Sequence, residues 1–145
     1  MYRPITIAIV RRIGIAAVPL LLSMASLSDD LTGSDALVCY GWSAARCDIE
    51  GTCEVTEPWQ LNLPDFLRID LEAKLAVTTE PAPQPRETEI HTVVRENNTI
   101  ILQGFQDGRA FSWLIQESSG EGTLTVSTPG EGLTVFTNCT PIEKL

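Results

Sequence analysis

Residues 89–139 alternate apolar and polar side chains with a period of two, and this pattern constrains the fold more than any other feature of the sequence. Successive side chains of a β-strand point to opposite faces, so the pattern predicts strands with one buried face. The alternation is clearest over 109–116, 122–127 and 133–139, while residues 99–103 are apolar on both faces. We therefore expect several neighbouring strands, with 99–103 as a central one.

Turn sequences separate these segments. Asp107-Gly108 lies between two of them, and Asp-Gly tolerates the positive φ angles of a tight hairpin. The other reversals are marked by Asn97-Asn98, Ser119-Gly120 and Pro129-Gly130. The sequence predicts an all-β fold, an antiparallel meander of about seven strands curled into a small barrel or sandwich.

Two upstream segments are expected to add strands to this sheet. Residues 59–63 alternate and are expected to form one strand. Residues 66–79 place an apolar face opposite a charged face if they form a strand. A helix is the alternative, but Ile69 and Val77 would then fall outside its apolar stripe, so a strand is favoured.

The first 28 residues have the composition of a secretory signal. Arginines at positions 3, 11 and 12 precede an uncharged run over 13–28, which is short for a helix that crosses a membrane. An uncleaved anchor is the alternative. The expected division is a signal peptide over 1–28, a flexible lead-in over 29–38 and one domain over 39–145, in a periplasmic or secreted protein.

Four cysteines occur in this exported chain, Cys39, Cys47, Cys53 and Cys139. An oxidising compartment and a small core favour two disulfides, and residues 39–58 are expected to form a disulfide-bonded N-terminal cap. Of three possible pairings, we favour Cys47–Cys53 as a local loop and Cys39–Cys139 as a link to the last strand. Zinc is the alternative, but the chain has no C-x-x-C pair and a single histidine, so no metal or other cofactor is predicted.

The spacing C-x7-C-x5-C, followed by a β-rich body that ends on a cysteine, is similar to that of small exported bacterial proteins of unknown function. The layout also resembles that of the periplasmic inhibitors of c-type lysozyme, in which a β-barrel is stapled between its two ends. The resemblance covers spacing and layout. It implies an inhibitor-like binding protein and assigns no site residue.

Charge narrows the range of partners. Seven basic and nineteen acidic residues follow residue 28, which gives a net charge of −12. Such a chain is repelled by nucleic acid and anionic lipid and attracted to basic partners. We therefore expect no nucleic-acid binding and, after signal cleavage, no membrane association. The leading hypothesis is a non-catalytic envelope protein that binds another protein, with a basic protein as the favoured partner.

Candidate catalytic residues are few. A serine hydrolase needs a base beside its nucleophile, and the only imidazole is His91, which is expected at a surface or edge. The carboxylate pairs Asp65 and Asp70, or Asp70 and Glu72, would suit a glycosidase, but acidic residues are common throughout the chain. No catalytic residue is predicted, and a small hydrolase ranks third.

The second hypothesis is a carrier whose barrel holds a small apolar ligand. A filled interior would exclude it, and a cavity of roughly 300 Å³ or more would favour it. The aromatic residues Tyr40, Trp42, Trp59 and Trp113 are expected in the core rather than on a ligand platform. Trp113 is the clearest case, because it shares one strand face with Phe111 and Ile115.

Overall fold

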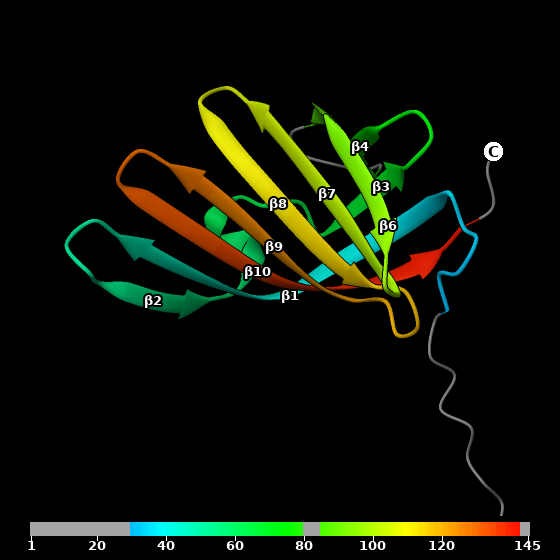
Figure 1. Cartoon of the computed structure of the whole chain (residues 1–145). Coiled ribbons are helices and arrows are strands. Elements are labelled where there is room, and N and C mark those ends of the chain that lie inside the picture. Colours follow the sequence, from blue (N-terminus) through cyan, green and yellow to red (C-terminus); the bar gives the residue numbers. More distant parts are fainter. Residues whose placement is uncertain (1–29, 80–84, 143–145) are drawn as a thin grey trace, which may run out of the picture.

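The computed structural model describes residues 30–79 and 85–142, and the expected signal over 1–28 lies outside them. The strands of this part of the chain form one ten-stranded sheet in which every pairing is antiparallel. The sheet curls into a half-barrel (Figure 1), so the prediction of an all-β fold is confirmed. None of the described residues belongs to a helix long and apolar enough to cross a membrane.

The strands follow one another along the chain with short connections. They are β1 (Ala36–Asp48), β2 (Cys53–Thr56), β3 (Phe66–Asp70), β4 (Leu75–Thr78), β5 (Glu87–Glu89), β6 (Thr92–Glu96), β7 (Thr99–Gln106), β8 (Arg109–Gln116), β9 (Glu121–Thr128) and β10 (Glu131–Pro141). A 3₁₀-helix, η1 (Pro58–Leu61), lies between β2 and β3. The order across the sheet is β5-β4-β3-β1-β10-β9-β8-β7-β6, and β2 pairs with β1.

Strands β6 to β10 form the predicted meander, and its four reversals lie at the predicted turn sequences. Asp107 and Gly108 join β7 to β8 with φ angles of 51° and 78°. Both central residues of this two-residue turn are left-handed, which matches the right-handed twist of the flanking strands. The turn chemistry therefore fixes the register of β8, and with it the side chains that face inward.

The N-terminal part of the domain is more extensive than expected. β1 begins at Ala36, and Leu31 and Leu37 are fully buried, so the packed domain starts before residue 39. Most of the disulfide-bonded segment 39–58 is paired into the sheet, because residues 39–48 belong to β1 and residues 53–56 form β2. β1 pairs with β10 on one side and with β2 and β3 on the other. The sequence did not indicate this earlier start, because Leu31 is a single apolar residue among polar ones and a single residue cannot show an alternating pattern.

Two predicted strands were wrong in detail. Most of 59–63 lies in η1, because Pro58 fixes its own φ angle at the first position and Asn62 ends the helix at a φ of 55°. Residues 66–79 form strands rather than a helix, but two of them, β3 and β4, joined by a tight turn. In that turn the Asp70 carboxylate accepts a hydrogen bond from the backbone N–H of Ala73 at 2.7 Å, and Lys74 adopts a φ of 56°.

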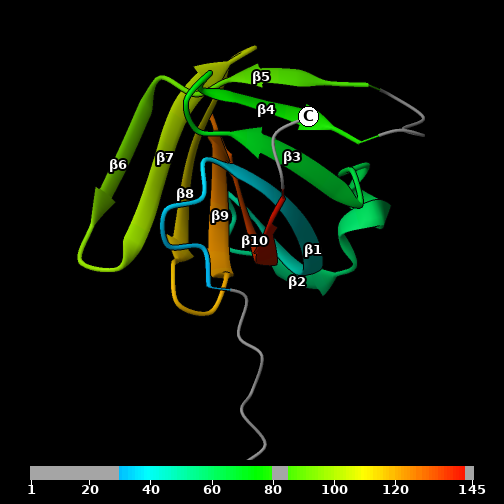
Figure 2. The same cartoon turned by 90° about the vertical axis from the view of Figure 1, so that its right-hand side faces the viewer.

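The two edge strands of the sheet, β5 and β6, are consecutive in sequence and joined by Ile90 and His91. The Ile90 N–H donates to the Lys74 carbonyl at 2.8 Å, and the His91 N–H donates to the Gln103 carbonyl at 2.9 Å. The chain thus changes partner from β4 to β7 within two residues. Figure 2 shows the result: β3, β4 and β5 form one wall, turned sharply from the wall of β6 to β9.

One end of the half-barrel, which we call the closed end, is filled by apolar side chains. Its fully buried members are Leu31, Leu37, Ile69, Ile90, Ile100, Leu102 and Ile115. Leu31 is held over it by its N–H, which donates to the Glu117 carbonyl at 2.8 Å. Arg95 of β6 fastens the same segment, because its guanidinium donates to the carbonyls of Leu31 and Ser34 and its Nε lies 3.0 Å from Glu117 Oε1.

Candidate functional site

The four cysteines form the two favoured disulfides, Cys39–Cys139 and Cys47–Cys53, and none is free. Cys39 and Cys139 face each other directly in the register of β1 and β10, and both are buried in the closed end. Cys47 and Cys53 are also register partners, in the more exposed β1–β2 hairpin. Two such bridges fit an oxidising compartment.

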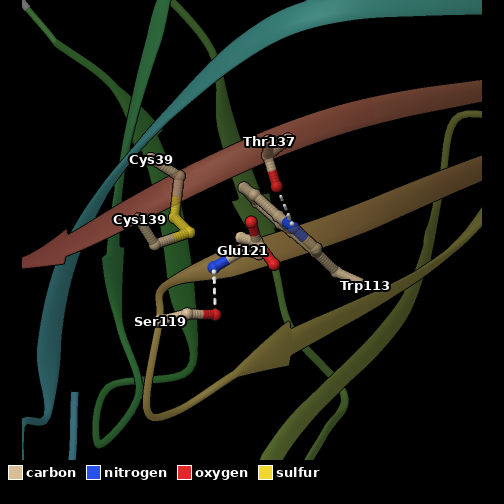
Figure 3. Close-up of a disulfide and its surroundings, with 6 residues drawn as sticks. All are labelled: Cys39, Trp113, Ser119, Glu121, Thr137 and Cys139. Atoms are coloured by element: carbon tan, nitrogen blue, oxygen red, sulfur yellow. Dashed lines mark hydrogen bonds between the residues drawn. A yellow bond between two sulfur atoms is a disulfide. The ribbon is translucent and has the colours of Figure 1, made fainter. Parts of the chain in front are cut away.

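Trp113 lies in the core as predicted, with 3% of its surface exposed. Its Nε1–H donates to Thr137 Oγ1 at 3.0 Å, which satisfies the buried indole (Figure 3). Gly122 on the neighbouring strand makes room for the ring, because a Cβ there would lie 3.0 Å from Trp113 Nε1. The indole is therefore both hydrogen-bonded and closely packed.

The prediction that the other three aromatic residues are core residues was wrong. Tyr40, Trp42 and Trp59 are 44%, 54% and 64% exposed. Tyr40 alternates with the inward Cys39, and Trp42 lies at a register shift of β1 and packs on Phe136 with ring centroids 5.6 Å apart. Trp59 is carried outward by η1. Alternation with Cys39 along one strand would have predicted that Tyr40 faces outward. The bulge at Trp42 and the 3₁₀-helix that contains Trp59 have no signal in the alternating pattern.

The residues considered for catalysis do not come together. His91 is exposed at the bend between β5 and β6. Asp70 holds the β3–β4 turn, and Asp65 and Glu72 are exposed. No group of three or more His, Cys, Asp or Glu side chains within residues 30–79 and 85–142 is placed to hold a metal ion.

The inward faces of the strands change character along their length. On β8, Ile115 is fully buried, Trp113 is nearly so, Phe111 is partly exposed and Arg109 is exposed. Leu124 and Val126 of β9 and Leu133 of β10 are likewise partly exposed, although they face inward beside Phe111 and Trp113. The sheet therefore leaves one end of its own interior unfilled.

This unfilled end is a cavity of about 960 Å³, which we call the groove. Its floor is apolar and consists of Leu67, Ala76, Phe111, Trp113, Leu124, Val126 and Leu133. Leu61, Leu63 and Pro64 of the η1 segment form one side, and Thr128 and Gln106 lie toward the rim. The alternating pattern predicted that most of the floor residues face inward. It did not predict that the η1 segment would lie along one side of the groove.

Charged side chains line the rim of the groove. Arg46 Nε lies 3.2 Å from Glu131 Oε2, which forms an ion pair between β1 and β10. The Arg86 guanidinium donates to the Asn62 carbonyl at 3.1 Å and links the η1 segment to the start of β5. Gln106 Nε2 donates to the Glu87 carbonyl at 3.1 Å, so the β7–β8 hairpin is tied to the same strand.

An apolar floor with a polar rim suits an elongated molecule that has one apolar part and one polar end. Such a site binds by covering partly exposed hydrophobic side chains, and each 100 Å² covered contributes about 2.5 kcal/mol before the costs of association. The function has to be inferred from this geometry, because no protein-family model, no curated protein and no solved structure matches the chain.

Proposed function

We propose that this protein is an exported carrier that binds an apolar ligand in the groove. The observation that supports this proposal is the volume of about 960 Å³ inside the sheet, above the lower bound of about 300 Å³ that is typical of ligand pockets. The apolar floor would be covered by such a ligand.

The rigidity of the floor favours binding without rearrangement. Trp113 is fixed by its hydrogen bond to Thr137, and Phe111 lies against Gly104, where a Cβ would come within 2.5 Å of the ring. Both aromatic rings are carried by the central part of β8, which is paired on both sides. A preformed site loses little conformational entropy when it is occupied.

The composition of the groove supports binding rather than catalysis. Its lining within the described residues contains no histidine and no cysteine. Of its three carboxylates, Glu131 is already paired with Arg46. The carboxylate pairs considered from the sequence, which include Asp65, Asp70 and Glu72, do not belong to the lining.

The place of action that we propose is the periplasm or the extracellular medium. Two disulfides and the apolar run over 13–28 support it. Intact-mass measurement of protein from envelope fractions should give a chain that begins near Asp29. Recovery of the full chain from Met1 in the cytosol would contradict this location.

The carrier proposal is tested with N-phenyl-1-naphthylamine, a neutral apolar dye whose fluorescence rises in apolar sites. We expect saturable binding to the wild type and its loss in Leu133→Arg, because Leu133 lines the groove. Thr134→Arg is the matched control, since Thr134 is the next residue of β10 and faces the outer side. Equal dye binding by both variants, or none by the wild type, would contradict the proposal.

A second candidate function is the binding of a basic protein by the outer face. Two aromatic pairs, Trp42–Phe136 and Tyr40–Phe66, are exposed there, and Leu114 of β8 is 50% exposed nearby. Exposed aromatic residues are common anchors in protein interfaces, and the net charge of −12 favours a basic partner. Envelope proteins captured by the wild type and lost with Trp42→Ala but not with Trp59→Ala would support this function. Capture unchanged by Trp42→Ala would exclude this face.

A further inference from the structure

The protein is acidic overall, but half of its described basic residues lie at the rim of the groove. The described residues include six arginines and lysines, and three of them line the groove: Arg46, Arg86 and Arg109. The same part of the chain has sixteen aspartates and glutamates, of which three line the groove: Glu87, Asp107 and Glu131. Positive and negative charges are therefore balanced at the rim, whereas acidic residues dominate elsewhere.

The three arginines differ in what they already bind. Arg46 is paired with Glu131. Arg86 donates to the Asn62 carbonyl, and a guanidinium carries five N–H donors, so this bond alone does not saturate it. Arg109 is exposed, and no hydrogen bond or ion pair joins its side chain to another described residue.

Arg109 lies where the apolar floor ends. It has the same inward parity on β8 as Phe111 and Trp113, and alternate residues of a strand are about 7 Å apart. Arg86 approaches from the opposite wall. Gln106, the register partner of Arg109, donates to the carbonyl of Glu87, the residue next to Arg86. Both guanidinium groups thus belong to the same end of the groove.

Two of the three acidic residues of the rim are less able to receive a cation, and the third, Asp107, is exposed in the β7–β8 turn two residues from Arg109. Glu131 is engaged by Arg46. Glu87 alternates with Thr88, whose register partner Ala76 is buried, so the Glu87 side chain lies on the outer side of β5. The distant acidic residues are screened over roughly 8 Å at physiological salt, whereas Arg–carboxylate contacts are direct and can be bidentate.

We infer that the ligand of the groove is an amphiphile with an anionic head, such as a carboxylate, bound by Arg109 and Arg86, and with its apolar chain on the floor. The inference rests on the proposed carrier function and specifies the chemical class of the ligand. The carboxylate would accept hydrogen bonds from the two guanidinium groups, and Phe111 would contact the first methylene groups of the chain.

The test compares three probes of equal chain length at pH 7 by titration calorimetry: decanoate, 1-decanol and decyltrimethylammonium. We expect decanoate to bind about tenfold more tightly than decanol, and the ammonium compound to bind more weakly than either. Raising the salt concentration should reduce the advantage of decanoate and leave decanol binding nearly unchanged.

Arg109→Gln should remove most of the preference for decanoate while decanol still binds. Arg68→Gln is the matched control, because Arg68 lies on β3, outside the groove lining, and removes the same charge. Equal affinities of decanoate and decanol for the wild type, or tighter binding of the ammonium compound, would overturn the inference and leave the carrier function standing. Binding of none of the three probes would overturn the carrier function itself.

Discussion

The closed end and the groove are built from the same strands but differ in what covers their inward faces. At the closed end, Leu31 and the Cys39–Cys139 disulfide complete the core. At the groove, η1 stands to one side and the inward residues of β8 to β10 remain partly exposed. Identical strand alternation thus gives a packed core at one end and an open, partly exposed groove at the other, depending on what the connecting segments supply.

The largest expected effect concerns the two disulfides, one at each end. Cys39–Cys139 spans 100 residues and Cys47–Cys53 spans 6. The chain-entropy model predicts losses of about 4.7 and about 2 kcal/mol in the free energy of unfolding when each is removed. Urea denaturation of the Cys39→Ala, Cys139→Ala variant and of the Cys47→Ala, Cys53→Ala variant would measure both. Equal losses would show that the closed end is not specially dependent on its bridge.

Trp113 sits at the boundary between the two regions. Trp113→Ala should lower the free energy of unfolding by about 3–5 kcal/mol, because it empties a buried site and leaves Thr137 Oγ1 without the indole donor. Ser112→Ala, on the outer face of the same strand, should change it by less than about 0.5 kcal/mol. If Trp113→Ala unfolds like the wild type but loses dye binding, Trp113 belongs functionally to the groove and not to the core.

The same substitution at each end compares them directly. Leu31→Ala should lower the free energy of unfolding by about 2–5 kcal/mol, since Leu31 is fully buried. Leu63→Ala should cost less than about 1.5 kcal/mol, because Leu63 lines the groove and is already partly exposed. Thermal denaturation provides both values, and a larger loss for Leu63 would reverse the assignment of the two ends.

The smallest expected effect is at the start of the closed-end segment. Hydrogen bonds from Thr32, first from its side chain and then from its backbone N–H, lower the pKa of Asp30. Because this pKa is lower in the folded state, the associated stability is present at neutral pH and is lost as the pH falls through the folded-state value. Thr32→Val should raise the pKa of Asp30, as measured by NMR titration. An unchanged value would mean that the backbone N–H alone sets it.

The meander and the short disulfide loop could be predicted because the deciding information is local, whereas Cys39–Cys139 spans 100 residues and was only the favoured one of three possible pairings. Asp107-Gly108 specifies a hairpin by itself, and alternation on β8 places Trp113 inward whatever the other strands do. The spacing of Cys47 and Cys53 suggested their pairing in the same way. These features need no knowledge of the rest of the fold.

The groove could not be predicted because it depends on segments whose signals are weak or misleading. The pattern over 59–63 alternates like a strand, yet Pro58 and Asn62 turn it into η1 beside the floor. The turn at 71–74 contains neither glycine nor proline, so the pattern predicts one continuous strand where the structure has β3 and β4. The direct step from β5 to β6, which brings Arg86 toward Arg109, has no sequence signature.

The pairing of β1 with β10 has a consequence for the kinetics of folding. These two strands are neighbours at the centre of the sheet, although they are the first and last strands in the sequence. Their pairing brings Leu37 opposite Pro141. Contacts between residues so far apart in sequence raise the contact order and slow folding. β1 cannot meet its longest partner until the last strand has been synthesised. A chain of this topology therefore cannot complete its central strand pair until its last strand is available.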